Sequence, residues 1–217
     1  AGGRVGSVWR VGSAGAGYPV PIGAGRIPLV GGWGGQAGGA LLRRAVAHLA
    51  PSITALTDLG ARFADAGHDL ALVGGPVRDA LLGRAVSDVD FTTSARPDET
   101  EALLAAWGTA TWDMGREFGT LGARRGDMVV EVTTYRADAY DGQTRKPIVA
   151  FGDSLEDDLV RRDFTVNAMA LRLPDLTFVD PHGGLADLED QVLRTPSAPE
   201  VSFGDDPLRM MRAARLA

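Results

Sequence analysis

Two aspartates separated by one residue, Asp88 and Asp90, are the side chains whose types and spacing point most directly to chemistry. The segment SDVDFTTS that contains them is predicted to form a strand, and alternate residues of a strand point to the same face. Two carboxylates side by side repel each other unless a cation neutralises them, and hard oxygen ligands suit Mg²⁺. The pair therefore predicts a Mg²⁺ site, with two solvated loop charges as the alternative.

A glycine pair and an arginine that precede these aspartates are suited to bind phosphate. Gly74 and Gly75 lie where a predicted strand leads into a predicted helix, so backbone N–H groups can approach an anion there. Arg78 lies one turn into that helix and can reach a triphosphate. The alternative is that the glycines form only a tight turn and that Arg78 pairs with Asp79.

The elements that must position these residues are predicted from hydrophobic spacing and from turn residues. The predicted helices cover residues 40–68 with a break at Pro51, 76–83, 97–107, 155–170, 183–193 and 205–217. The predicted strands cover residues 69–75, 87–94, 117–125, 127–136, 170–173 and 176–180. Residues 136–157 are predicted to form a loop. The fold class is therefore α+β, with a mixed sheet and flanking helices followed by the start of a helical region.

The composition narrows the class of protein. A chain of 217 residues with 45% hydrophobic residues can form one domain and part of a second. The absence of cysteine excludes disulfides and thiolate metal sites. No apolar run approaches the ~20 residues of a transmembrane helix, and no secretory signal pattern is present, so we expect a cytoplasmic protein. The net charge of −6 disfavours binding of nucleic acid over the whole surface. We therefore expect any extended nucleic-acid contact to lie in a local basic patch or outside this chain.

Residues 1–39 differ from the remainder of the chain. They hold 14 of the 29 glycines and no acidic residue, and their apolar residues follow no helical or strand period. Such a segment buries too little surface to offset its ordering entropy. We therefore predict a disordered leader over residues 1–39.

Some aromatic side chains are given structural roles. His48, His68 and His182 are scattered without metal-ligand spacing and are predicted to be surface or structural residues. Trp107 and Trp112 flank a helix-to-strand junction and are predicted to be core residues rather than platforms on which bases stack.

Several long motifs resemble those of one enzyme family. LVGGPVRDALLGR, SDVDFTT, DDLVRRDFTVNAMA, DPHGGLADLEDQVLR and DDPLRMMRAARLA resemble the signatures of class II tRNA nucleotidyltransferases and bacterial poly(A) polymerases. They occur in the family's order over residues 70–217. The resemblance implies a polymerase-beta-like nucleotidyltransferase head over residues 40–180 and the start of an all-α neck over residues 181–217. Because the chain stops inside a predicted helix, we expect it to be a fragment.

The resemblance implies a reaction with two Mg²⁺ ions. Asp88 and Asp90 would bind the ions while a terminal ribose hydroxyl attacks the α-phosphate of a nucleoside triphosphate. Glu131, on a later predicted strand, would supply a third carboxylate. The alternative for Glu131 is a structural role, with ion pairs to Arg124, Arg125 or Arg136.

The second motif implies further nucleotide contacts. Arg162 corresponds to an arginine that contacts the nucleotide in the family, and Asn167 would contact the ribose or triphosphate. The alternative for Arg162 is a solvated face, on which Arg161 and Arg162 pair with Asp157 and Asp158.

The last motif implies recognition of the incoming base. A carboxylate only accepts hydrogen bonds and an arginine only donates them, so Asp206 and Arg209 would accept cytosine or adenine and reject uracil or guanine. Arg212 and Arg215 would bind triphosphate or ribose. The family has glutamate where this chain has Asp205, so the part played by Asp205 is open. The alternative for the whole segment is a charged, exposed helix.

The implied function is addition of CCA to the 3′ end of tRNA from CTP and ATP without a template. The alternatives are a poly(A) polymerase, an enzyme that adds only CC or only A, and a fragment that binds nucleotide without turnover. The sequence leaves the oligomeric state open.

Overall fold

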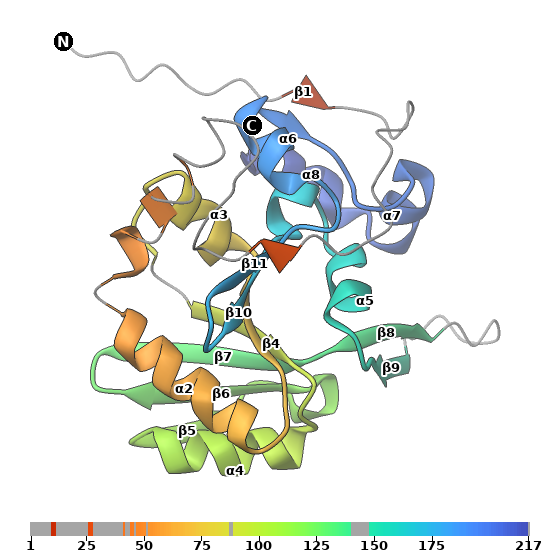
Figure 1. The fold of residues 1–217 in the computed structure, drawn as a ribbon. Helices are drawn as coiled ribbons and strands as arrows, with labels where there is room; N and C mark the ends of the chain where they lie inside the picture. The colour runs from red at the N-terminus through yellow and green to blue at the C-terminus, as the bar shows by residue number, and fades with distance from the viewer. Residues whose placement is uncertain are drawn as a thin grey trace.

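The computed structural model has an eight-stranded mixed sheet as its central element (Figure 1). The structure describes residues 10–11, 26–27, 41, 44–45, 47–50, 52–86, 89–139 and 148–216. The strands of this sheet, in spatial order, are β2 (Arg26–Ile27), β11 (Thr177–Val179), β10 (Ala170–Leu173), β3 (Leu70–Val73), β4 (Val89–Thr93), β7 (Met128–Thr134), β6 (Thr120–Arg125) and β5 (Ala110–Asp113). Only β4 and β7 are parallel neighbours; each other pair in the sheet is antiparallel.

Two smaller strand pairs and a set of short helices complete the described fold. The pairs are β1 (Arg10–Val11) with β12 (Val192–Leu193), and β8 (Arg136–Ala139) with β9 (Ile148–Phe151). The helices are α2 (Ile53–Asp65), α3 (Gly75–Leu81), α4 (Pro97–Trp107), α5 (Leu155–Val160), α6 (Gly184–Glu189), α7 (Pro199–Asp205) and α8 (Leu208–Leu216), with 3₁₀ turns η1 (Arg116–Phe118) and η2 (Thr165–Asn167). In Figure 1, α7 and α8 lie at the end of the molecule opposite α4.

Alternation along the strands builds a core on each face of the sheet. Leu70 and Leu72 of β3 pack in the larger core with α2 and α4. Ala71 and Val73 point to the opposite face, where they pack in a smaller core with Tyr135 and α5. Helices α2 and α4 thus cover one face, and the opposite face, against which α5 packs, also holds polar side chains of β4 and β7 that line a cavity.

The predicted helix over residues 155–170 is wrong beyond its first turns. Helix α5 ends at Val160, and Phe164 has an extended backbone with φ −134° and ψ 152°. The Asp163 carboxylate accepts hydrogen bonds from the Phe164 N–H at 2.8 Å and from Asn167 Nδ2 at 2.9 Å. This local pairing competes with the helical hydrogen bonds and turns the chain, so that the Phe164 side chain is buried.

The remaining predictions concern a loop, the last helix, the leader, the domain boundary and the fold class. The predicted loop over residues 136–157 contains β8, β9 and the start of α5. The predicted helix over residues 205–217 begins only at Leu208, because Asp206 takes a non-helical conformation between α7 and α8. The leader 1–39 lies outside the described residues except for β1 and β2, and the predicted boundary at residue 180 stays a prediction. The expected α+β class with a mixed sheet and flanking helices is confirmed.

Candidate functional site

A cavity of about 470 Å³ opens on the face of the sheet that α2 and α4 leave uncovered. Its lining comes from the sheet, from the segment around α5 and from the start of α8. The lining residues are Val73, Asp90, Phe91, Thr120, Glu131, Thr133, Arg136, Asp158, Arg161, Arg162, Asp206, Arg209 and Arg212. Five arginines and four carboxylates therefore share one cavity, which suits a ligand that is anionic and a cation that accompanies it.

The floor of the cavity is a pair of carboxylates on neighbouring strands. Asp90 of β4 is directly opposite Glu131 of β7 in the parallel register, so both side chains point to the same face. The buried Phe91, Val130 and Val132 point to the other face and hold the two strands against the larger core. Asp88 lies outside the described residues, so the expected Asp88–Asp90 pair stays a prediction.

The turn between β3 and α3 lies against an arginine of the second motif. Gly74 has φ 74° and ψ −137°, a conformation that side chains rarely adopt, and a Cβ there would lie 3.1 Å from Arg162 Nη1. Arg162 also donates a hydrogen bond of 3.0 Å from Nη2 to Asp158 Oδ2. The glycine thus makes room for a guanidinium that faces the cavity.

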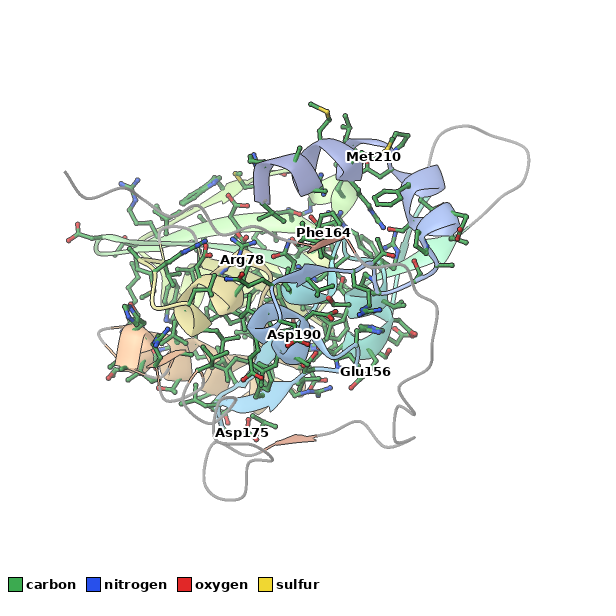
Figure 2. All side chains as sticks on the ribbon, turned by 90° about the horizontal axis from the view of Figure 1, so that it is seen from above. Arg78, Glu156, Phe164, Asp175, Asp190 and Met210 are labelled. Carbon is green, nitrogen blue, oxygen red and sulfur yellow. The ribbon has the colours of Figure 1, made fainter. Side chains whose placement is uncertain are left out.

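Arg78 is engaged within the fold and does not line the cavity. It binds both oxygens of Asp79 at 3.0 Å, the pairing that the sequence left as the alternative. Its Nη1 donates to Asn167 Oδ1 at 2.6 Å, and Asn167 in turn donates to Asp163. Figure 2 shows Arg78 among the packed elements of the molecule. Gly75, Arg78 and Asn167 therefore form a layer behind the lining residues.

The opposite wall is the junction of α7 and α8. Asp206 Oδ1 accepts the Leu208 N–H at 2.9 Å and so caps the start of α8. Arg209 donates from Nη1 to the buried Ser202 Oγ at 2.6 Å and from Nη2 to the Arg161 carbonyl oxygen at 2.6 Å. Arg212 lies 3.8 Å from Asp206. The structure brings the predicted acid and its arginines together at the cavity.

Two further residues of the last motif do not line the cavity. Arg215 is exposed near the end of α8 and does not line the cavity. Asp205 is exposed at the end of α7. The role expected for Arg215 stays a prediction, and the part played by Asp205 stays open.

The cavity contains residues that the sequence did not indicate as ligands. Arg136 follows β7, and its guanidinium donates to the Phe118 carbonyl oxygen at 3.0 Å. Burial lowers the pKa of Arg136, which makes an anionic partner favourable beside it. Thr120 and Thr133 share a hydrogen bond of 3.0 Å across β6 and β7. Alternation along the β6–β7 hairpin was the signal that could have placed Thr133 on the face of Glu131.

The metal-binding capacity of the site depends on its oxygen donors. Among the residues that the structure describes, no group of three or more His, Cys, Asp or Glu gathers as a metal site. Asp90 and Glu131 nevertheless offer adjacent hard oxygen donors in the cavity, and Mg²⁺ is commonly held by one or two carboxylates together with substrate phosphates. The residues present therefore fit a divalent cation. Separately, none of the helices in the described part of the chain is both long and apolar enough to cross a membrane.

The sheet with its carboxylate pair on parallel strands, facing a glycine turn and arginines, has the architecture of a nucleotidyltransferase head domain. Residues 70–194 match the family described as the poly A polymerase head domain, and the chain belongs to this family. The resemblance drawn from the motifs is thereby confirmed.

Known relatives extend this comparison. A CCA-adding enzyme from Geobacillus thermodenitrificans is 44% identical over 150 residues, which are 69% of this chain and 36% of that enzyme. The structure of the Bacillus stearothermophilus CCA-adding enzyme in complex with CTP aligns with TM-score 0.64 and 37% identity, over 77% of this chain and 38% of that one. The Thermotoga maritima CCA-adding enzyme complexed with tRNA aligns with TM-score 0.65 and 28% identity, over 83% and 40%. The chain thus spans little more than a third of the length of these relatives.

Proposed function

We propose that this chain is the catalytic head of an enzyme that adds CCA to the 3′ end of tRNA from CTP and ATP. The observation that carries the proposal is the cavity in which Asp90 and Glu131 face Arg162 and Arg209. One wall suits a triphosphate and its cation, and the other offers a donor and an acceptor for a base. The relatives named above support tRNA and CTP as substrates.

We assign the chemistry to groups at the two sides of the cavity. Asp90 and Glu131, with Asp88, would hold Mg²⁺, which neutralises charge on the phosphates and activates the attacking hydroxyl when it is bound. Arg162, whose Nη1 lies close to Gly74, binds the triphosphate. Gly75, Arg78 and Asn167 support that side from behind, because Arg78 and Asn167 are linked by a hydrogen bond of 2.6 Å.

We assign base selection to the wall formed by α7 and α8. Asp206 accepts the amino group that cytosine and adenine share, and Arg209 donates to the ring nitrogen beside it. In the structure Arg209 is bound to Ser202 and to the Arg161 carbonyl oxygen, which fixes its guanidinium at the edge of the cavity. Arg212, close to Asp206, is assigned to the triphosphate or ribose, and Arg215 to the same ligand from the end of α8.

The same head is compatible with narrower activities. A poly(A) polymerase or an enzyme that adds only CC or only A would use the same carboxylates and the same base-reading pair. We further propose that residues 40–180 form the head domain, that residues 181–217 begin a helical neck, and that the protein acts in the cytoplasm, where its substrates are.

The test is incorporation of labelled CTP and ATP into tRNA that lacks its 3′ CCA, with Mg²⁺ present. We expect addition of C, C and A in that order, with UTP and GTP rejected. Extension with A from ATP alone would favour a poly(A) polymerase, and arrest after CC would favour an enzyme that adds only CC. Nucleotide binding without incorporation by this chain, together with activity of a longer form, would identify the chain as a binding fragment.

A further inference from the structure

The position of Trp112 differs from the core position that the sequence predicts. Trp107 is 4% exposed and belongs to the larger core, as predicted, but Trp112 of β5 is half-buried and does not. A Cβ on Gly122 of β6 would lie 2.4 Å from Cε2 and Nε1 of the Trp112 indole. The indole therefore lies against the backbone of Gly122, and only glycine leaves room for it there.

The indole lies on the same face of the sheet as the cavity carboxylates. In the strand register, Trp112 is opposite Gly122, Gly122 is opposite Glu131, and Glu131 is opposite Asp90. Directly opposed residues point to the same face of a sheet, and each strand is about 5 Å from the next. Because the indole covers Gly122, its ring lies about one strand spacing from Glu131.

The loop after Trp112 is held by polar contacts while its apolar side chains are exposed. Asp113 accepts the N–H groups of Gly115 and Arg116 at 2.7 Å each, which lowers the pKa of its carboxyl. Arg116 also binds Glu101 at 2.8 Å. Phe118 is nevertheless 49% exposed, and Met114 is exposed to a similar extent.

This loop adjoins the rim of the cavity at Phe118. The Phe118 carbonyl oxygen accepts from Arg136, and the same guanidinium reaches Thr120 Oγ1 at 3.4 Å. Both Arg136 and Thr120 line the cavity. Phe118 therefore adjoins the site through its backbone, and Trp112 lies on the face of the sheet that bears Glu131. Trp112 and the exposed Met114 and Phe118 that follow it in the chain are called the apolar patch.

The in-line geometry of phosphoryl transfer indicates which substrate binds next to the patch. In phosphoryl transfer the attacking and leaving oxygens lie roughly in line, on opposite sides of the phosphorus. Gly74 and Arg162 lie on the β3 side of β4, whereas Trp112 lies on the β7, β6 and β5 side. A triphosphate bound on the first side leaves the second side for the strand that supplies the hydroxyl.

We propose that Trp112 is the stacking platform for the base at the 3′ end of the acceptor RNA. The proposal rests on the proposed nucleotidyl transfer and adds the residue that binds the other substrate. Aromatic rings bind bases of single strands through their faces with little sequence preference. The base at the 3′ end of the RNA changes with each nucleotide that is added. A stacking platform binds each of these bases, so it suits an enzyme that makes successive additions.

The test compares Trp112→Ala and Trp112→Phe with Val201→Ala, which removes an exposed apolar side chain from α7. We expect Trp112→Ala to raise the KM for tRNA lacking CCA about tenfold while the KM for CTP changes by less than about twofold. Trp112→Phe, which keeps an aromatic ring, should retain most of the wild-type affinity for tRNA, and Val201→Ala should leave the KM for tRNA unchanged. Thermal unfolding of each variant establishes that the comparison is made on folded protein.

A modified RNA isolates stacking from other effects. An acceptor whose 3′-terminal nucleotide lacks its base should lose about tenfold in affinity for the wild type and nothing further for Trp112→Ala. An equal loss in both proteins, or an equal rise in the KM for CTP, would overturn the platform. If neither this chain nor a longer form incorporates a nucleotide, the proposed function fails, and equilibrium binding of a short single-stranded RNA to the same variants still decides the role of Trp112.

Discussion

The sheet floor and the α7–α8 wall hold their functional side chains in different ways. Beneath Asp90 and Glu131, the alternate residues Phe91, Val130 and Val132 are at most 1% exposed and join the larger core. Helix α8 has no buried residue, and Leu208, Met210 and Met211 are exposed by 65%, 55% and 71% (Figure 2 shows Met210 at the edge of the molecule).

The difference separates the region to which we assign the chemistry from the region to which we assign selection of the base. Burial of a large apolar side chain contributes about 1.5–3 kcal/mol, whereas a hydrogen bond contributes about 1 kcal/mol net. The carboxylate pair is therefore fixed by the core, and the position of Asp206 and Arg209 depends on a few polar contacts to Ser202 and the Arg161 carbonyl. Substitutions in the two regions should consequently have different effects.

The largest effect is expected on the floor, where Asp90→Ala removes a proposed metal ligand. Incorporation should fall about a thousandfold or more, because charge on the phosphates is no longer neutralised. The melting temperature should not fall, since the side chain faces the cavity. Single-turnover incorporation measures the first effect, with Asp98→Ala, an exposed carboxylate on α4, as control. Retained activity in Asp90→Ala would remove it from the metal site.

A pair of truncations compares the two regions by stability. Phe91→Ala should lower the free energy of unfolding by about 3–5 kcal/mol, because it leaves a cavity in the core. Met211→Ala on α8 should change it by no more than about 0.5 kcal/mol, because the side chain is already exposed. Denaturant unfolding measures both. Equal losses would mean that α8 is packed as firmly as the sheet.

On the wall, Asp206→Ala should change selectivity more than turnover. Loss of a charge-assisted hydrogen bond to the amino group lowers the preference for CTP over UTP by about 10- to 100-fold. Competition between labelled CTP and UTP measures this preference. An unchanged ratio would mean that Asp206 serves only as the cap of α8, where it accepts the Leu208 N–H.

A smaller effect is expected from Ser202→Ala, which removes one partner of Arg209. The loss of about 1 kcal/mol should weaken base preference about fivefold and leave the KM for tRNA unchanged. The same competition assay measures it, and Ser202→Thr, which keeps the hydroxyl, is the matched control. A larger effect than that of Asp206→Ala would assign base selection to the arginine alone.

The smallest effect is expected at the loop that follows Trp112. The pKa of Asp113 is lowered because the Gly115 and Arg116 N–H groups donate to its ionised form. Its contribution to stability is thus present above the ordinary pKa of an aspartate and is lost as the pH falls through the lowered one. Asp113→Asn should therefore lose less stability than the wild type between about pH 5 and pH 2. Parallel acid-unfolding curves would contradict this.

The sequence predicts what depends on local pattern. Strand alternation and turn residues place the β6–β7 hairpin. The face that Asp90 and Glu131 share depends on the parallel pairing of β4 with β7, which no local pattern specifies. The motifs identify the family and the acid–arginine pair at Asp206 and Arg209.

What the sequence misses depends on contacts between distant segments. The position of Trp112 follows from its pairing with Gly122, which no local period indicates. The helix predicted to continue past Val160 ends because Asp163 binds the backbone, and Arg78 turns inward because Asn167 and Asp79 both accept from it. Burial and pairing decided these positions, and hydrophobic spacing could not.

The close approach of Arg162 to Gly74 has an evolutionary consequence. A Cβ at this position would lie 3.1 Å from Arg162 Nη1, and the backbone at φ 74° disfavours any residue other than glycine, so both the turn and the guanidinium beside it select glycine. Two motifs far apart in the sequence are therefore under one joint constraint. Among homologues that retain this arginine, position 74 should be invariant.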